Sequence, residues 1–265
     1  MPTKRYANWE SFPVPEAPPG SVQGDLPVAF SADLSAASVL AACRRGIVPL
    51  PAAGETFRTF NEFRYRDHVE AGAIAVVGSD QEDPYWAAWW SPDPRLVLGA
   101  ADVHLGRNTR KRLRRDELTT TADTAFRRVA EACRAGREPR WLTDTLLSSL
   151  TELHSAGWAH STEVWLGGEL VGGAMGIGIG TVLSGDTLFG RHPGAAAVAV
   201  ADMGARLAAA GGTVIDAQWD SPFLRALGAV PVARPRFRAL LSLDAGPLAL
   251  PRRELPARRL LPAPS

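Results

Sequence analysis

The sequence contains few cysteines and no long apolar run. Its two cysteines, Cys43 and Cys133, lack metal-ligand spacing, which excludes a disulfide framework and argues against a zinc site. No stretch approaches the roughly 18 apolar residues of a membrane helix. The first 20 residues are polar and rich in proline, without the apolar centre of a secretory signal. These absences predict a cytoplasmic protein that does not bind a membrane.

Neither sign of charge dominates, because the sequence has 29 basic and 28 acidic residues and therefore a net charge of +1. The overall charge therefore gives no indication of a nucleic-acid partner. One local run is strongly basic, and its members are Arg107, Arg110, Lys111, Arg112, Arg114 and Arg115. If Asn108 caps a helix here, residues four apart gather their charge on one side. Such a run is either a solvated helix face or a surface for a phosphate backbone.

The chain divides into a proline- and glycine-rich beginning, a mixed region and a regular region. Residues 1 to about 30 are expected to wrap over a surface. A short helix is predicted after Ser31 or Asp33, ending before Gly46. From residue 100 onward the hydrophobic pattern becomes regular, and the tail after Gly246 is expected to be disordered.

The regular region predicts an α+β fold. Apolar stripes predict helices over about 124–135 and 143–156, and alternation predicts strands over 161–166, 169–179 and 182–189. A helix over about 194–210, a strand over 214–218, a short helix from Pro222 and a strand over about 237–243 follow. This order matches a GNAT-like acyltransferase domain with a mainly antiparallel mixed sheet, by analogy alone.

Several short motifs stand in the order found in one known family. They are Arg44 to Ile47, Trp89 to Arg95, His104 with the basic run, Asp123 to Phe126, Trp141, Leu153-His154, Ala159 to Ser161 with Glu163 and Trp165, Leu170 to Gly173, Phe189 with Arg191, Asp216 with Gln218, and Leu227 to Ala229. The run Trp-Trp-Ser-Pro-Asp-Pro-Arg is unusual by itself. The chain thus resembles the leucyl/phenylalanyl-tRNA–protein transferases over most of its length.

The resemblance implies a small N-terminal domain over residues 1–99 and a GNAT-like catalytic domain over 100–246, followed by the tail at 247–265. It implies an aminoacyltransferase that takes a large apolar amino acid from aminoacyl-tRNA. The acceptor is the N-terminal Arg or Lys of a protein, which is thereby marked for degradation. No metal or organic cofactor is implied, and we expect a monomer.

The expected reaction requires an acceptor amine aligned with the ester carbonyl and stabilisation of the oxyanion. Asp216 and Gln218 lie two apart on a predicted strand and therefore share a face. By resemblance, Asp216 is a base or an electrostatic anchor and Gln218 an intervening hydrogen-bonding group. An Asp at a strand end is otherwise common and carries no function by itself.

The resemblance also assigns binding residues. Trp141 corresponds to a tryptophan that stacks on the terminal adenosine, although packing at a helix start explains it equally. Glu163 and Asp186 are expected to line the site, with Asp186 standing where the family usually has Glu. Arg107, Arg110, Lys111, Arg114 and Arg115 would then bind the acceptor-stem phosphates.

The chain departs from the family near the site. Val48-Pro49-Leu50 replaces a tryptophan-containing motif, and the segment over about 52–85 is longer than usual, forming an added hairpin or a lid. The aminoacyl pocket, which includes Phe189, has Ala174, Leu183 and Met203 where bulkier groups are typical. An alternative is therefore a specialised relative that acylates a small-molecule amine in natural-product biosynthesis.

Two other classes of function compete. Arg191 to Ala196 fits the Arg-x-x-Gly-x-Ala loop by which GNAT acetyltransferases hold the CoA pyrophosphate, although Pro193 removes one backbone donor. This favours an acyl-CoA-dependent N-acyltransferase. The other alternative is a protein that binds tRNA without catalysis, against which Asp216 and Gln218 argue.

Overall fold

The computed structural model describes residues 3–14, 26–79, 81–135, 140–241 and 246–262, and the backbone alone at Asp186. The chain forms two compact units. The first comprises Met1–Pro94, Gly136–Glu152 and Ala233–Ala239, and the second comprises Arg95–Ala135, Leu153–Val232 and Leu240–Ser265. The division predicted at residue 99 stays a prediction about domains.

The first unit is built on a five-stranded sheet in the order β1-β4-β2-β5-β3. These strands are β1 (Arg5–Tyr6), β2 (Ala29–Phe30), β3 (Val48–Pro51), β4 (Ala75–Val77) and β5 (Ala87–Trp90). Its helices are α1 (Ala36–Cys43), α2 (Glu55–Glu70), the 3-10 turn η1 (Pro84–Trp86), α8 (Arg234–Arg238) and most of α5 (Asp144–Ser155). Ser35 caps α1 by accepting a hydrogen bond from the Ser38 backbone, so the predicted caps, Ser31 and Asp33, are wrong.

The long segment at 52–85 is not a hairpin. It consists mainly of α2 followed by β4, which pairs in parallel with β1 and β2. Tyr65 and Val69 are the buried residues of α2, and they pack with Phe30 in the core of this unit. The segment at 52–85 therefore contributes an interior strand, β4, to the five-stranded sheet.

The second unit contains an eight-stranded sheet in the order β12-β6-β11-β10-β9-β8-β7-β13. Its strands are β6 (Arg95–Gly99), β7 (Leu118–Ala122), β8 (Ala159–Leu166), β9 (Glu169–Ile179), β10 (Val182–Gly190), β11 (Val214–Gln218), β12 (Val230–Val232) and β13 (Leu255–Pro256). β10 and β11 run parallel, and the other neighbours pair antiparallel. Its helices are α3 (Arg107–Arg115), α4 (Phe126–Arg134), α6 (Ala195–Ala209), α7 (Pro222–Ala226) and the 3-10 turn η2 (Ala257–Leu260).

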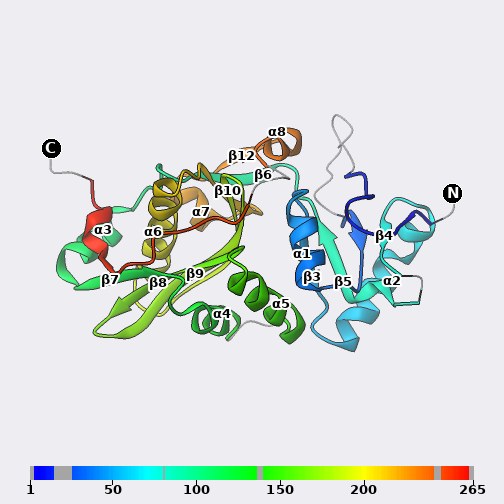
Figure 1. Cartoon of the computed structure of the whole chain (residues 1–265), viewed down its shortest axis with the longest axis horizontal. Coiled ribbons are helices and arrows are strands. Elements are labelled where there is room, and N and C mark those ends of the chain that lie inside the picture. The colour runs from blue at the N-terminus through cyan, green and yellow to red at the C-terminus, as the bar shows by residue number, and fades with distance from the viewer. Residues whose placement is uncertain (1–2, 15–25, 80, 136–139, 242–245, 263–265) are drawn as a thin grey trace. The chain divides into compact units, whose positions relative to one another are not determined.

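Glycines in β9 let two helices approach opposite faces of this sheet (Figure 1). A Cβ at Gly172 would lie 2.7 Å from that of Ala195 in α6, and one at Gly173 would lie 3.0 Å from Val129 in α4. Successive strand residues point to opposite faces, so α6 and α4 cover different sides. The predicted α+β fold is confirmed.

The predicted strand over 237–243 is wrong within the described residues. Phe237 belongs to α8, and the edge strand that pairs with β6 is β12. The helix starts where the backbone N–H of Arg234 donates to Asp93 Oδ1 at 3.0 Å, and Pro235 follows in its first turn. Proline lacks the N–H that a strand ladder needs but is tolerated at a helix start.

The segment after Gly246 is ordered over 246–262, where a disordered tail was expected. Leu255 and Pro256 pair with β7, and Leu250 and Ala257 are buried. Arg259 donates to the buried carboxylate of Asp202 on α6. The composition that suggested disorder thus has structural roles: Pro256 lies in an edge strand, where proline is tolerated, and Arg259 neutralises a buried acid.

Candidate active site

Asp216 and Gln218 meet at the end of β11, beside β10 and β6. Asp216 is fully buried and Gln218 is 5% exposed. The pairing with β6 shifts between these two residues, which marks a β-bulge, and Gln218 has a φ of 60°. Its backbone N–H donates to Asp216 Oδ1 at 2.9 Å. The structure thus brings together the two residues that the sequence singled out.

Two further side chains complete this cluster, and the sequence interpretation did not include them in the site. Arg95 Nε donates to Asp216 Oδ1 at 2.9 Å, and Arg95 Nη2 donates to Oδ2 at 2.8 Å. Ser184, directly opposite Asp216 on β10, donates from its hydroxyl to Oδ2 at 2.9 Å. Gln218 Nε2 lies 3.3 Å from Ser184 Oγ. We name Arg95, Ser184, Asp216 and Gln218 the β11 cluster.

Glu163 is fully buried on β8 and is surrounded by hydroxyl groups. Its Oε2 accepts from Thr121 at 2.5 Å and Thr124 at 3.0 Å, and its Oε1 accepts from Ser161 at 2.5 Å. Trp165 Nε1 in turn donates to the Thr121 hydroxyl at 2.9 Å. Hydroxyl donors satisfy a buried acid, so this arrangement gives Glu163 a structural explanation beside its expected role.

Asp123 lies next to this network and adopts a φ of 55°. It accepts from the Ser161 backbone at 2.9 Å, and its Oδ2 lies 2.9 Å from His160 Nδ1. Burial raises the pKa of Asp123, but the hydrogen bonds from His160 and Ser161 and the charges of His160 and His154 outweigh it and hold the pKa below its ordinary value. Asp123 therefore remains a carboxylate at neutral pH.

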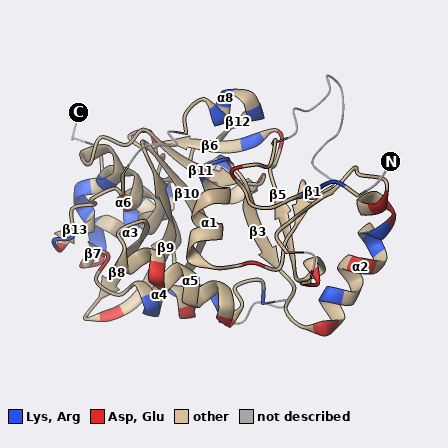
Figure 2. Cartoon of the chain, turned by 45° about the vertical axis from the view of Figure 1, so that its right-hand side comes forward, with Lys and Arg blue, Asp and Glu red and all other residues tan. Residues whose placement is uncertain are grey.

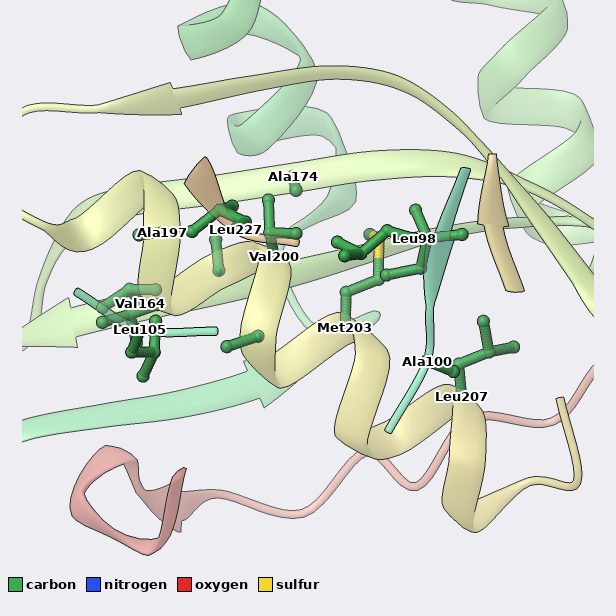
Figure 3. Close-up of a cluster of buried hydrophobic side chains, with 14 of the residues drawn as sticks. Leu98, Ala100, Leu105, Val164, Ala174, Ala197, Val200, Met203, Leu207 and Leu227 are labelled. Atoms are coloured by element: carbon green, nitrogen blue, oxygen red, sulfur yellow. The ribbon is translucent and has the colours of Figure 1, made fainter. Parts of the chain in front are cut away.

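The residues assigned to the aminoacyl pocket are packed in the core of the second unit. Ala174 is 3% exposed, Leu183 0% and Met203 2%, and all three belong to one hydrophobic cluster. Figure 3 labels Ala174 and Met203 in it. Phe189 is 9% exposed, with the Arg191 guanidinium 5.4 Å from its ring centre. These side chains are buried in the core of the second unit, and their assignment to an aminoacyl pocket stays a prediction.

A cavity of about 430 Å³ lies instead at the start of α6. The loop Gly190–Gly194 lines it, together with Thr109 of α3, Ala196, Ala197 and Phe223. This loop is the one that fits the CoA pattern. Pro193 has no N–H. The N–H groups of Arg191 and His192 donate to the Val171 carbonyl at 2.8 and 3.3 Å, and that of Ala195 donates to the His192 carbonyl at 3.0 Å, so four positions offer no free donor to a pyrophosphate.

For two of the predicted site residues, Trp141 and Asp186, the structure gives no side-chain position relative to the β11 cluster. Trp141 is half-buried before α5 and belongs to the first unit, whereas the β11 cluster lies in the second. The backbone of Asp186 lies in β10 at a break in the pairing with β9, but its side chain lies outside what the structure describes. Their expected roles stay predictions.

The basic run forms α3, as predicted, and Figure 2 shows its charge along the helix. Gly106 rather than Asn108 stands at the cap. Leu113 is buried, whereas Arg107, Lys111, Arg114 and Arg115 are exposed and Arg110 is half-buried. Arg112 and Asp116 form an ion pair at 3.8 Å, and across the described chain no ion pair involves the other five basic residues of α3.

Two features are absent from the described residues: a metal-ligand cluster and a helix that could span a membrane. No group of three or more His, Cys, Asp or Glu side chains is placed to hold a metal ion. None of the helices there has the length and apolar character to cross a membrane.

Comparison with known proteins identifies the family. The family model described as leucyl/phenylalanyl-tRNA protein transferase matches residues 97–242. The chain belongs to this family. The match spans both α3 and the strand that carries Asp216 and Gln218.

Relatives in this transferase family are more than a third identical to the chain over the aligned residues. The leucyl/phenylalanyl-tRNA–protein transferase of Teredinibacter turnerae is 44% identical over 58% of this chain and 61% of its own length. That of Chromohalobacter salexigens is 46% identical over 56% of this chain and 59% of its own. That of Salinibacter ruber is 38% identical over 68% and 80%. The chain thus spans about three fifths of the length of the first two relatives.

Proposed function

We propose that this protein transfers an aminoacyl group from an aminoacyl-tRNA to the N-terminal amine of a protein that begins with Arg or Lys. The observation that carries the proposal is the family match over 97–242. The matched region contains the basic helix α3 and three residues of the β11 cluster, Ser184, Asp216 and Gln218, all within one compact unit. The names of the relatives specify leucyl- or phenylalanyl-tRNA as donor and a protein as acceptor.

The chemistry needs no ATP, because an aminoacyl-tRNA is already an activated ester. The acceptor nitrogen attacks the ester carbonyl carbon and the ester C–O bond breaks. The ribose oxygen leaves with a proton, and the nitrogen loses one as the amide forms. The protein contributes alignment and charge stabilisation, which are large effects when the groups are held in place. Charged tRNAs belong to the cytoplasm, where we propose that the protein acts.

The exposed basic residues of α3 are proposed to bind tRNA phosphates. Five of its basic side chains have no carboxylate partner in the described chain, so their mutual repulsion falls when a polyanion binds. By family correspondence, Glu163 and Asp186 are proposed to line the aminoacyl site, with Phe189, Ala174, Leu183 and Met203 as the pocket. The stacking of Trp141 on the terminal adenosine is proposed separately, from the resemblance alone.

The test is transfer from separately charged tRNAs to a peptide that begins with Arg. Labelled leucine or phenylalanine should appear in the peptide, and a peptide that begins with Glu is the matched control. Label in both peptides alike would contradict the proposed acceptor specificity. Label in neither peptide would contradict the proposed reaction.

A further inference from the structure

The β11 cluster fills every acceptor position of Asp216. Oδ1 receives Arg95 Nε and the Gln218 backbone N–H, and Oδ2 receives Arg95 Nη2 and the Ser184 hydroxyl, all within 2.8–2.9 Å. A carboxylate offers about four lone-pair positions. An acceptor amine could therefore reach Asp216 only by displacing one of these donors.

Gln218 depends on this arrangement for its conformation. A positive φ is uncommon for a residue other than glycine, and it persists where surrounding contacts enforce it. Here the enforcing contact is the bond from the Gln218 N–H to Asp216, and the Ser184 hydroxyl lies beside the side-chain amide. The cluster thus contacts both the backbone N–H and the side-chain amide of Gln218.

We propose that Arg95 and Ser184 are positioning residues for the transfer reaction, which fix Asp216 and, through it, Gln218. Asp216 acts as the anchor of this arrangement, and the acceptor's proton passes to the leaving ribose oxygen. This inference rests on the proposed function. It adds two residues to the site and decides between the two roles that the resemblance allowed for Asp216.

Ser184→Ala is the first variant, because it removes one hydroxyl while leaving the buried ion pair intact. We expect kcat to fall about tenfold or more while KM for aminoacyl-tRNA stays within about twofold. Thr162→Val is the matched control, since Thr162 is another buried strand hydroxyl, which donates to the Ala199 carbonyl at 3.0 Å. Equal kcat values in the two variants would make Ser184 merely structural and overturn the proposal.

Arg95→Lys and Arg95→Met test the arginine. Lysine keeps the charge but cannot make the two parallel hydrogen bonds to the carboxylate. We therefore expect the kcat of Arg95→Lys to lie between that of the wild type and the much lower kcat of Arg95→Met. If Arg95→Met does not fold, Arg95→Lys still decides the matter. A wild-type kcat in Arg95→Lys at an unchanged melting temperature would contradict a positioning role.

A double variant distinguishes one arrangement from two independent roles. If Ser184 acts through Asp216, then Asp216→Asn with Ser184→Ala should be no slower than Asp216→Asn alone. Multiplied losses would overturn the proposal.

Hydrogen exchange separates this inference from the proposed function. The Gln218 amide should exchange about tenfold faster in Ser184→Ala than in Thr162→Val, whether or not transfer occurs. Wild-type protein that transfers nothing would refute the proposed function alone. An unchanged Gln218 exchange rate would refute the positioning arrangement alone.

Discussion

The carboxylate of Asp123 makes the stability of the second unit depend on pH in the acid range. Besides His160 and Ser161, it has His154 Nδ1 and Arg252 Nε at 3.8 Å. Because its folded pKa lies below the unfolded value, its contribution is present above about pH 4 and is lost as pH falls through the folded pKa.

Asp123→Asn should therefore lower the free energy of unfolding at pH 7 by about 1–3 kcal/mol. The difference from wild type should shrink as pH falls below about 4. Urea unfolding at several pH values measures both. A difference that grows with acidity would contradict the assigned sign.

Leu183 separates the core interpretation from the pocket interpretation. Its side chain is fully buried, so Leu183→Ala should cost about 2–5 kcal/mol of stability through the cavity it leaves. Leu207→Ala, in the same cluster, is the matched control. If Leu183 is core alone, neither variant changes the ratio of leucine to phenylalanine transferred. A changed ratio in Leu183→Ala only would place it in the pocket.

At the residue scale, the sequence predicted that Asp216 and Gln218 lie together, but not the side chains that surround them. The spacing of Asp216 and Gln218 predicted a shared location, and their common partner Ser184 agrees with it. The bulge that accompanies it leaves no mark in the hydrophobic pattern. Arg95 stood at the end of a recognised motif, but its burial and its pairing with a residue 121 positions away depend on the sheet order.

Among the elements, α3 carries the expected tRNA contact. Arg110→Glu with Lys111→Glu should weaken tRNA binding by at least about tenfold and reduce the salt slope by about 1.5, since each phosphate contact contributes roughly 0.7–0.9. Arg64→Glu with Arg236→Glu makes the same charge change at exposed positions of the first unit. Equal losses in the two variants would show that only overall charge matters.

Arg259 of η2 holds the C-terminal segment against α6 of the second unit. Asp202 is fully buried and accepts from Thr120 at 2.9 Å, from Arg206 at 2.7 Å and from Arg259. Arg259→Met should lower stability by about 1–3 kcal/mol, because one charged donor to a buried acid is lost. Arg258→Met, an exposed neighbour in the same turn, should be close to wild type. Equal melting temperatures would contradict the role of Arg259.

Elements with strong periodicity were predicted well, and those defined by single contacts were not. The predicted bounds of β9 and β11 agree with the structure. The strand expected at 237–243 failed because an Asp93 contact, distant in sequence, starts α8 there. The ordered tail was missed because its anchor, Asp202, lies inside a helix whose partners composition does not reveal.

At the scale of the whole molecule, membership of the transferase family supports the proposed aminoacyl transfer. The family match covers residues 97–242, and the remaining chain includes α2 and β4, in the segment that the resemblance predicts to be longer than usual. The identity of the acceptor is the central claim, because a peptide N-terminus and a small amine present the same nucleophile.

One transfer assay tests that claim most directly. Purified protein is given leucyl- or phenylalanyl-tRNA with an Arg-initiated peptide and, in parallel, a pool of small amines. We expect labelled peptide, unlabelled small amines, and much slower but measurable labelling of the peptide with Asp216→Asn. Label that moves only to small amines, or that moves equally well with Asp216→Asn, would contradict that claim.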